Sequence, residues 1–398
     1  MGVAVSGGSD SLALLYLLQE FCALHDITLR AVTVDHGLRE AGAHEAEMVS
    51  QHCARLGVPH DTVLWENWDG KGNLQKSARE ARYEKMTEWA AQYDISTIAV
   101  GHTADDQAET VLMRLSRSAG VDGLSGIPYR TLRNGITWVR PLLKTQRAVL
   151  RAYLQDHDIH WADDPSNHDE RFDRVKARKA LKLLSELGIT QDVLAEVADH
   201  LTEARKALDW QTFLAAKEIV RIEANAVMID DMGLRLQPDE IQRRVLLNAI
   251  KWINGSPYSP RRGAVAHVMA ALANGKAGTL DGVHLRRIGT KLWVFREHRV
   301  VSAVRSPTHS IWDGQWRLLP FPPASHGDDL HVTALGAQGL EHCPDWRATG
   351  RPQEVLKSTP AIWRGQTLVA APFAGFEENW HVEHVRGKDA FFATLLSH

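Results

Sequence analysis

The sequence has little cysteine, no long apolar run and almost no net charge. Its three cysteines, Cys22, Cys53 and Cys343, are far apart and form no C-x-x-C pair, which argues against a disulfide framework and a zinc site. No apolar run reaches the ~20 residues of a membrane span, and the N-terminus shows no signal-peptide pattern. We therefore expect a cytoplasmic protein with no membrane partner. The net charge of −3 neither demands nor excludes a nucleic-acid partner.

A loop of small residues follows the first apolar run, but it lacks the lysine of a Walker motif. Gly2–Val5 is typical of a strand, Ser6–Ser11 (SGGSDS) of a turn, and Leu12–Leu18 of a buried helix. Strand, loop and helix in this order bind phosphate on backbone N–H groups at a helix N-terminus. Asp10 either caps that helix or holds Mg²⁺ or a substrate ammonium. The predicted phosphate-binding residues are Ser6, Gly7, Gly8, Ser9, Asp10 and Ser11.

The first half of the chain alternates strand and helix patterns, which predicts an α/β fold with a doubly wound, mostly parallel sheet. At 398 residues the chain is too long for one ordinary core. We expect the α/β domain over residues 1–188, a mainly helical domain over 189–302 and a small α/β domain over 303–398. The predicted strands are Gly2–Val5, Leu29–Val34, Thr62–Trp65, Thr97–Val100 and Thr137–Pro141; the predicted helices are Ser11–His25, Glu40–Leu56, Gln75–Tyr93, Ala104–Ser118, Gln191–Glu223 and Pro238–Ile253.

Two further polar clusters follow predicted strands. Asp35 and His36 follow the second strand, and the block Gly101–Leu115 (GHTADDQAETVLMRL) follows the fourth. Ligands bind outside the carboxyl ends of the strands in open parallel sheets, so these clusters and the first loop indicate one crevice. His102 lies four residues before Asp106, which favours a functional role for both, although acids in a first helical turn also complement the helix dipole. For His36 a structural turn explains the sequence equally well.

Two segments carry arginines at spacings that suit anion recognition. Ala78–Tyr83 places two arginines and a phenol on one helix face, and residues 161–184 are the most basic stretch of the chain. A solvated helix face explains either segment; recognition of phosphate or carboxylate groups is the alternative. The candidate residues are Arg79, Arg82, Arg171, Arg174 and Arg178.

With these motifs the sequence resembles the tRNA(Ile)-lysidine synthetase family, a branch of the N-type ATP pyrophosphatases. The S-G-G-x-D-S loop is the hallmark of those pyrophosphatases, and HTADDQAET is a specific motif of the resemblance. Similarity extends along most of the chain. It covers Val34–Leu38, Ala78–Tyr83, His102–Leu115, Gly120–Pro128, Arg140–Leu143, Asp163–Asn167 and, more weakly, Thr359–Pro372.

The resemblance implies an ATP-dependent ligase that works in two steps. The C2 oxygen of the wobble cytidine, in tRNA(Ile) with a CAU anticodon, attacks the α-phosphorus of ATP and pyrophosphate leaves. The ε-amine of free lysine then attacks C2, AMP departs and lysidine forms. Because the bond that breaks lies between the α- and β-phosphates, a lysine for the γ-phosphate is not needed.

The resemblance also implies roles for single residues. Asp10, His102 and Asp106 match the residues that line the family's catalytic centre, and Asp10 and Asp106 are the candidates to hold Mg²⁺. Arg79 or Arg82 matches an arginine near the reacting phosphate. We further assign His36 to ATP binding and Arg171, Arg174 and Arg178 to tRNA binding.

Other classes of function are still open. A tRNA-thiolating or other amidating enzyme of the PP-loop superfamily has the same loop. Thiolation typically uses cysteine pairs and amidation needs an ammonia source, and the sequence shows neither. A nucleotide sensor or RNA-binding module that performs no reaction would not need Asp10, His102 and Asp106. A homodimer is compatible with the sequence, although no decisive apolar stripe marks one.

Overall fold

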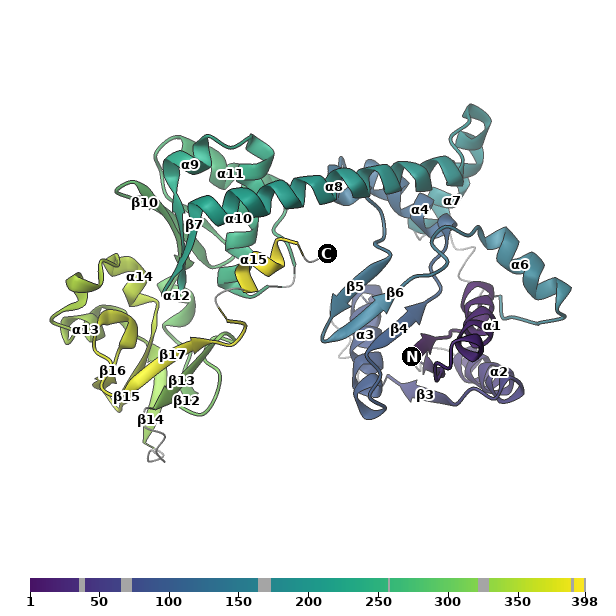
Figure 1. The fold of residues 1–398 in the computed structure, drawn as a ribbon, viewed down its shortest axis with the longest axis horizontal. Helices are drawn as coiled ribbons and strands as arrows, with labels where there is room; N and C mark the ends of the chain where they lie inside the picture. The colour runs from purple at the N-terminus through teal and green to yellow at the C-terminus, as the bar shows by residue number, and fades with distance from the viewer. Residues whose placement is uncertain are drawn as a thin grey trace. The chain divides into compact units, whose positions relative to one another are not determined.

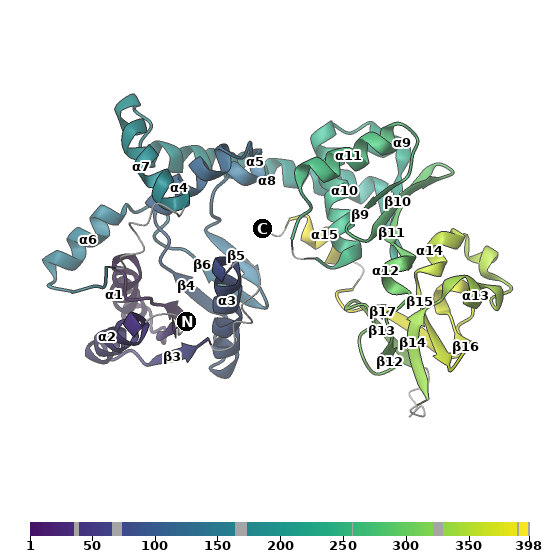
Figure 2. The ribbon, with the colours of Figure 1, turned by 180° about the vertical axis from the view of Figure 1, so that it is seen from behind.

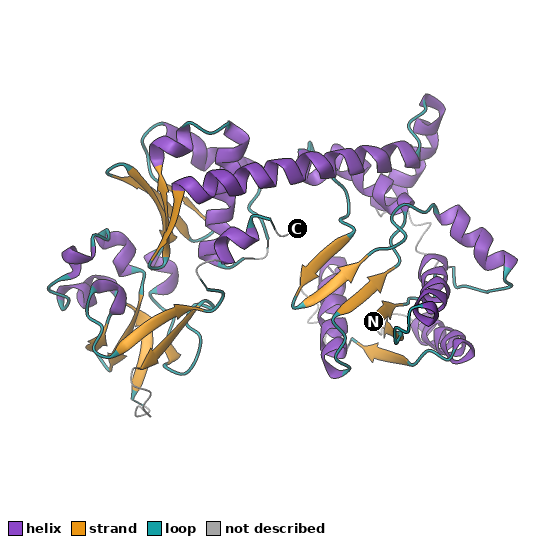
Figure 3. Ribbon diagram, viewed as in Figure 1, coloured by secondary structure: helices purple, strands orange, loops and turns teal. Residues whose placement is uncertain are grey.

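A computed structural model describes residues 1–35, 40–65, 74–163, 173–256, 258–320, 329–387 and 390–396. The chain divides into two compact units, Met1–Arg205 and a second that starts at Lys206. The division falls inside the long helix α8 (Gln191–Ile219). Figure 3 marks the helices and strands of both units. None of the described helices is both long and apolar enough to cross a membrane.

The described residues of the first unit form a six-stranded sheet. Its strands are β1 (Gly2–Ala4), β2 (Arg30–Asp35), β3 (His60–Leu64), β4 (Thr97–Val100), β5 (Arg130–Arg133) and β6 (Ile136–Val139). They lie in the order β3-β2-β1-β4-β6-β5, and all are parallel except β5. β1 therefore lies between β2 and β4, with Val3 opposite both Ala31 and Ala99. Strand order reverses at this point, which is where open α/β sheets bind their ligands.

Helices cover both faces of this sheet, which confirms the doubly wound fold (Figures 1 and 2). The helices are α1 (Ser9–Leu24), α2 (Glu40–Leu56), α3 (Leu74–Gln92), α4 (Ala104–Leu115), α5 (Val121–Leu124), α6 (Arg147–Asp156) and α7 (Asp173–Leu184). On one face α1, α2 and α6 share an apolar core with Val3 and Ala99. On the other face Met86 and Trp89 of α3 pack in a core with the fully buried Trp138.

The predicted elements of this unit agree closely with the observed ones. Glu40–Leu56 and Thr97–Val100 have the predicted bounds, and the other elements differ by a few residues at their ends. The antiparallel strand β5 was not predicted. It joins β6 through Asn134 and Gly135, whose φ angles of 52° and 77° suit the tight turns of hairpins. The Asn-Gly pair was thus the signal for this strand.

The second unit begins with an antiparallel sheet backed by helices. Its strands β7 (Val220–Glu223), β8 (Ala226–Asp230), β9 (Gly278–Leu280), β10 (Val283–Ile288) and β11 (Lys291–Arg296) lie in the order β7-β8-β11-β10-β9. The core contains residues of α8, α9 (Asp231–Arg235), α10 (Asp239–Asn254), α11 (Arg262–Ala273) and α15 (Ala390–Thr394). The predicted helix Gln191–Glu223 is four residues too long, because its last four residues form β7. Val220 and Ile222 are β-branched there, which favours a strand.

The rest of the second unit contains two smaller sheets that share one apolar core. One has the order β12-β14-β15-β16, and the other pairs β13 with β17. Trp312, Trp316 and Ile362 belong to this core. The elements are α12 (His298–Val301), β12 (Ser306–Pro307), β13 (Trp316–Pro320), β14 (Leu330–Ala334), α13 (Gly336–Glu341), α14 (Gln353–Lys357), β15 (Pro360–Arg364), β16 (Thr367–Ala370) and β17 (Trp380–His384). Domain boundaries after residues 188 and 302 stay a prediction.

Candidate functional site

A cleft of about 1000 Å³ lies in the first unit, at the carboxyl ends of β1, β2 and β4. Its wall includes the Ser6–Ser11 loop, the start of α4 and side chains of α3, α6 and α7. The cleft brings together most residues that the sequence singled out for chemistry: Ser6, Gly8, Ser9, Asp10, Ser11, Arg79, Arg82, His102, Asp106, Arg174 and Arg178. His36 and Arg171 lie outside the described residues.

Two glycines bring the first loop and the end of β4 close together. Gly7 has a φ of 83°, a conformation that residues with a side chain rarely adopt. A Cβ added at Gly101 would lie 3.0 Å from the backbone oxygen of Asp10. Gly7 also accepts a hydrogen bond from the N–H of Ala162 at 2.9 Å, which ties the loop to the segment after α6.

The loop is held by its own serines and leaves several N–H groups available. Ser11 Oγ accepts a hydrogen bond from the N–H of Ser6 at 3.1 Å and donates one to the carbonyl of Gly8 at 3.0 Å. Within the described part of the chain, the N–H groups of Gly8, Ser9 and Asp10 donate no hydrogen bond. These donors lie at the start of a 16-residue helix, so they suit an anion such as a phosphate.

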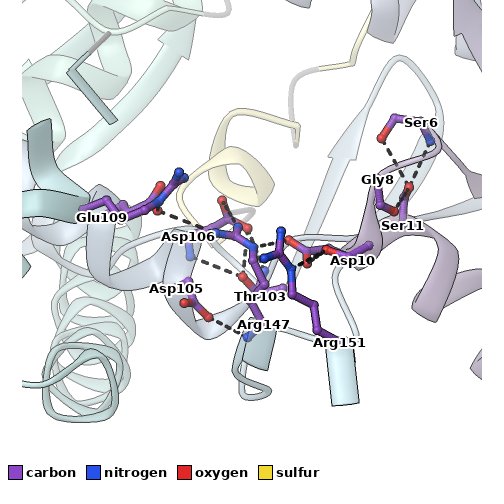
Figure 4. Close-up of polar contacts among 12 residues, drawn as sticks. Ser6, Gly8, Asp10, Ser11, Thr103, Asp105, Asp106, Glu109, Arg147 and Arg151 are labelled. Carbon is purple, nitrogen blue, oxygen red and sulfur yellow. Dashed lines mark hydrogen bonds and ion pairs between the residues drawn. The ribbon is translucent and has the colours of Figure 1, made fainter. Parts of the chain in front are cut away.

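Asp106 is both a helix cap and a residue of the cleft. Its Oδ2 accepts a hydrogen bond from the N–H of Thr103 at 2.9 Å, and its own N–H donates to Thr103 Oγ1 at 3.4 Å, so the two residues form a capping box (Figure 4). Oδ2 also accepts from Thr103 Oγ1 at 3.1 Å. Its Oδ1 lies 3.7 Å from Arg147 Nη2 and 3.8 Å from Arg174 Nη1. Burial raises the pKa of Asp106, but the guanidinium of Arg147 and the hydrogen bond from the N–H of Thr103 act against burial, and the pKa is lowered. The carboxylate is therefore ionised.

His102 is a neutral side chain at the end of β4. Burial lowers the pKa of His102 to about 4, against the opposing effect of Asp106. Its buried Nδ1 has no hydrogen-bond partner in the described part of the chain. A buried polar atom without a partner is costly, so Nδ1 is available to a ligand.

Arg147, which no sequence motif marked, contacts three acids in or behind the wall of the cleft (Figure 4). Its Nε donates a hydrogen bond to Asp10 Oδ2 at 2.8 Å. Its other guanidinium nitrogens lie 3.7 Å from Asp106 Oδ1 and 3.9 Å from Glu109 Oε1. Its backbone N–H donates to Asp105 Oδ2 at 2.7 Å. Asp10 is 137 residues away in the chain, so no local pattern marks this cluster.

Glu109 is the most enclosed acid of this cluster, with 1% of its side chain exposed. Arg178 Nε donates to its Oε1 at 2.9 Å, while Oε2 has no partner among the residues described. Burial raises the pKa of Glu109, and Arg178 opposes this effect. Arg174 and Arg178 of α7 thus lie beside Asp106 and Glu109, and their predicted contact with tRNA stays a prediction.

Arg79 and Arg82 both line the cleft from α3, and both are exposed. Arg79 Nη2 lies 3.5 Å from the hydroxyl oxygen of Tyr83. The guanidinium carbon of Arg133 lies over the same ring, 4.7 Å from its centroid. Arg151 of α6 lines the cleft as well and donates to Ser9 Oγ at 3.3 Å. The cleft therefore presents guanidinium groups from more than one helix toward an anion.

The carboxylates of the cleft suit a magnesium ion that arrives with a nucleotide. Within the described ranges, no group of three or more His, Cys, Asp or Glu residues is arranged to hold a metal ion. Asp10 and Asp106, however, contact the same guanidinium. Mg²⁺ is usually bound by one or two carboxylates together with substrate phosphates and water. This donor set fits that pattern.

The similarity of this chain to known proteins covers the first unit and most of the second. Residues 1–184 match the PP-loop domain family of ATP-binding proteins. A tRNA(Ile)-lysidine synthase of Ruegeria pomeroyi is 48% identical and covers 100% of this chain and 94% of its own. Another tRNA(Ile)-lysidine synthase, from Wolbachia pipientis, is 34% identical. The match covers 94% of this chain and 88% of the Wolbachia protein. A solved U34-tRNA thiolase from Methanococcus maripaludis covers 51% of this chain and 71% of its own, with 18% identity and a TM-score of 0.44.

Proposed function

Because the chain belongs to the tRNA(Ile)-lysidine synthase family, we propose that it converts a cytidine of tRNA(Ile) to lysidine. The acceptor is the wobble cytidine of a CAU anticodon, the donor is free lysine, and ATP is split into AMP and pyrophosphate. The 48% identity along the whole chain is the observation that carries this proposal. We place the reaction in the cytoplasm.

In the first step the cleft holds ATP for attack at its α-phosphorus. The free N–H groups of Gly8, Ser9 and Asp10 bind the triphosphate at the start of α1. The C2 oxygen of cytidine forms a bond to the α-phosphorus while the bond to the leaving pyrophosphate breaks. Arg79 or Arg82 neutralises the charge that develops on the α-phosphate. Asp10 and Asp106 would hold Mg²⁺, which supplies charge neutralisation at the pyrophosphate.

In the second step lysine replaces AMP at C2. The ε-ammonium of lysine must lose a proton before its nitrogen can form the new bond. A carboxylate that lines the cleft is suited to accept this proton. The bond between C2 and the adenylate oxygen then breaks, and AMP leaves with the electron pair.

Sulfur transfer to tRNA is a weaker proposal, because the cysteines do not suit it. All three are free and buried. Cys22 and Cys53 lie inside α1 and α2, and burial raises the pKa of Cys53 to about 12. A sulfur carrier needs an accessible thiolate.

Labelled lysine tests the proposed function directly. The protein, ATP, Mg²⁺ and labelled lysine are mixed with tRNA(Ile) that carries CAU, and tRNA(Met) with the same anticodon serves as control. We expect label on the first tRNA alone. An unlabelled tRNA(Ile), under conditions where ATP still binds, would contradict the proposal and direct the search to other amines and to sulfur donors.

The assembly state needs a separate measurement. We propose that the protein can work as a homodimer, as the sequence allows. Sedimentation velocity over a range of protein concentrations measures the mass of the particle, and a constant monomer mass would contradict this proposal.

A further inference from the structure

Three acids in or directly behind the wall of the cleft come from two different helices, and one side chain of α6 contacts all of them. Asp10 belongs to α1, and Asp106 and Glu109 belong to α4. Arg147, the first residue of α6, contacts all three with its guanidinium. Its side chain is only 19% exposed, so solvent screens these contacts poorly.

We propose that Arg147 is a positioning residue that aligns Asp10 with Asp106 for the adenylation step. This inference rests on the proposed function for the identity of that step. Two carboxylates repel each other when they share a partly buried site, and nothing in their own helices holds them together. A guanidinium presents five N–H donors in a rigid fork, so one arginine can hold carboxylates from two elements at once.

The backbone of Arg147 has a different role from its side chain. Its N–H donates to Asp105 Oδ2 at 2.7 Å, which joins the start of α6 to α4. Leu150 and Leu154 anchor α6 in the apolar core of the sheet. Both contacts persist when the side chain of residue 147 is changed. A substitution at Arg147 therefore releases the carboxylates and leaves α6 attached.

Three variants separate alignment from charge and from folding. Arg147→Met removes the guanidinium with little change in volume, and Arg147→Lys keeps the charge without the fork. Arg30→Met is the matched control. Arg30 is also partly buried, and its Nε lies 2.7 Å from Asp61 Oδ2. It does not line the cleft. The assay measures tRNA-dependent pyrophosphate release as kcat and KM, together with the affinity for tRNA and the melting temperature.

We expect Arg147→Met to lower kcat by about 100-fold or more, as when a preorganised donor is removed from an active site. The KM for ATP and the affinity for tRNA stay close to those of the unmodified protein. The melting temperature falls, because the carboxylates lose their counter-charge, but the protein remains folded at the assay temperature. Arg147→Lys recovers part of the rate, since a single ammonium cannot hold both carboxylates. Arg30→Met keeps its kcat.

Several results would overturn the inference. These are an unchanged kcat in Arg147→Met, full activity in Arg147→Lys, and a loss of rate that only parallels a loss of folded protein. Lysine incorporation is measured beside pyrophosphate release in the unmodified protein. Pyrophosphate release without lysidine would contradict the proposed function and still allow Arg147 to be tested, whereas no release with any tRNA would contradict both.

Discussion

At the scale of single residues, Asp106 uses one carboxylate oxygen for structure and the other for the cleft. Oδ2 caps α4 through Thr103, and Oδ1 lies near the guanidinium groups of Arg147 and Arg174. We expect Asp106→Ala to abolish tRNA-dependent pyrophosphate release and to lose about 1 kcal/mol of stability with the cap. A pyrophosphate assay and urea unfolding measure the two effects.

Asp106→Asn separates the two roles of this residue. An asparagine oxygen still accepts a hydrogen bond from the N–H of Thr103, so most of the cap remains. Its neutral side chain cannot balance the arginines, and pyrophosphate release stays lost. Binding of tRNA remains close to normal in both variants. A near-normal rate of release in Asp106→Asn would remove Asp106 from the reaction.

His384 makes the stability of the second unit depend on pH. Burial lowers the pKa of His384 to about 4, and the nearby Arg386 adds to this effect. The ring stacks on Trp252 with their centroids 4.4 Å apart. An unfolded chain takes up the proton near pH 6.5, whereas the folded chain resists it down to about 4. The free energy of unfolding therefore decreases as pH falls between these values.

His384→Phe keeps an aromatic ring on Trp252 and cannot titrate. We expect thermal unfolding of this variant to change less between pH 7 and pH 5 than that of the unmodified protein. His381→Phe on the same strand is the control, because His381 is exposed to solvent. Equal pH dependence in His384→Phe and the unmodified protein would contradict this account.

At the scale of elements, Gln107 of α4 holds the loop that follows α5. Its side-chain amide accepts from the N–H of Ile127 at 2.6 Å and donates to the carbonyl of Ile127 at 3.0 Å. Gly126 has a φ of 67°, and a Cβ there would overlap with Oε1 of Gln107. We expect Gly126→Ala to lower the free energy of unfolding by about 2 kcal/mol or more, from backbone strain and from this overlap.

Gly135→Ala is the control for the overlap. Gly135 has a φ of 77°, but a Cβ there would meet no atom within 4 Å. Alanine at this position causes backbone strain but no overlap. We therefore expect Gly135→Ala to lower the free energy of unfolding by about 1 kcal/mol. Urea unfolding of both variants measures the difference. Equal losses of unfolding free energy in the two variants would show that the side chain of Gln107 moves away from the new methyl group without an energetic cost.

Elements with a clear local pattern were predictable from the sequence, and contacts between distant elements were not. Glu40–Leu56 has helical periodicity throughout, and its bounds were predicted. The loop Ser6–Ser11 was recognised because its small residues follow a strand directly. Arg147 was missed because its importance comes from carboxylates on two other helices. The double role of Asp106 was missed for a related reason, since the sequence shows the cap and the cleft residue as alternatives.

At the scale of the whole molecule, the first half of α8 belongs to the first unit. Leu194 and Ala198 pack in a core with Val111 and Leu181. Thr202 Oγ1 donates to the carbonyl of Ser125 at 3.2 Å. The boundary predicted from the sequence, after residue 188, would separate Leu194, Ala198 and Thr202 from the unit that they contact. A boundary near residue 205 keeps them.

Two fragments of the chain test this boundary. We expect fragment 1–205 to fold and to bind ATP with the affinity of the full chain. Fragment 1–188 exposes the apolar surface that Leu194 and Ala198 cover, which lowers its stability by about 2–4 kcal/mol. Thermal unfolding and ATP titration of both fragments measure this. Equal stability would mean that α8 adds nothing to the first unit, and that the boundary belongs where the composition of the sequence changes.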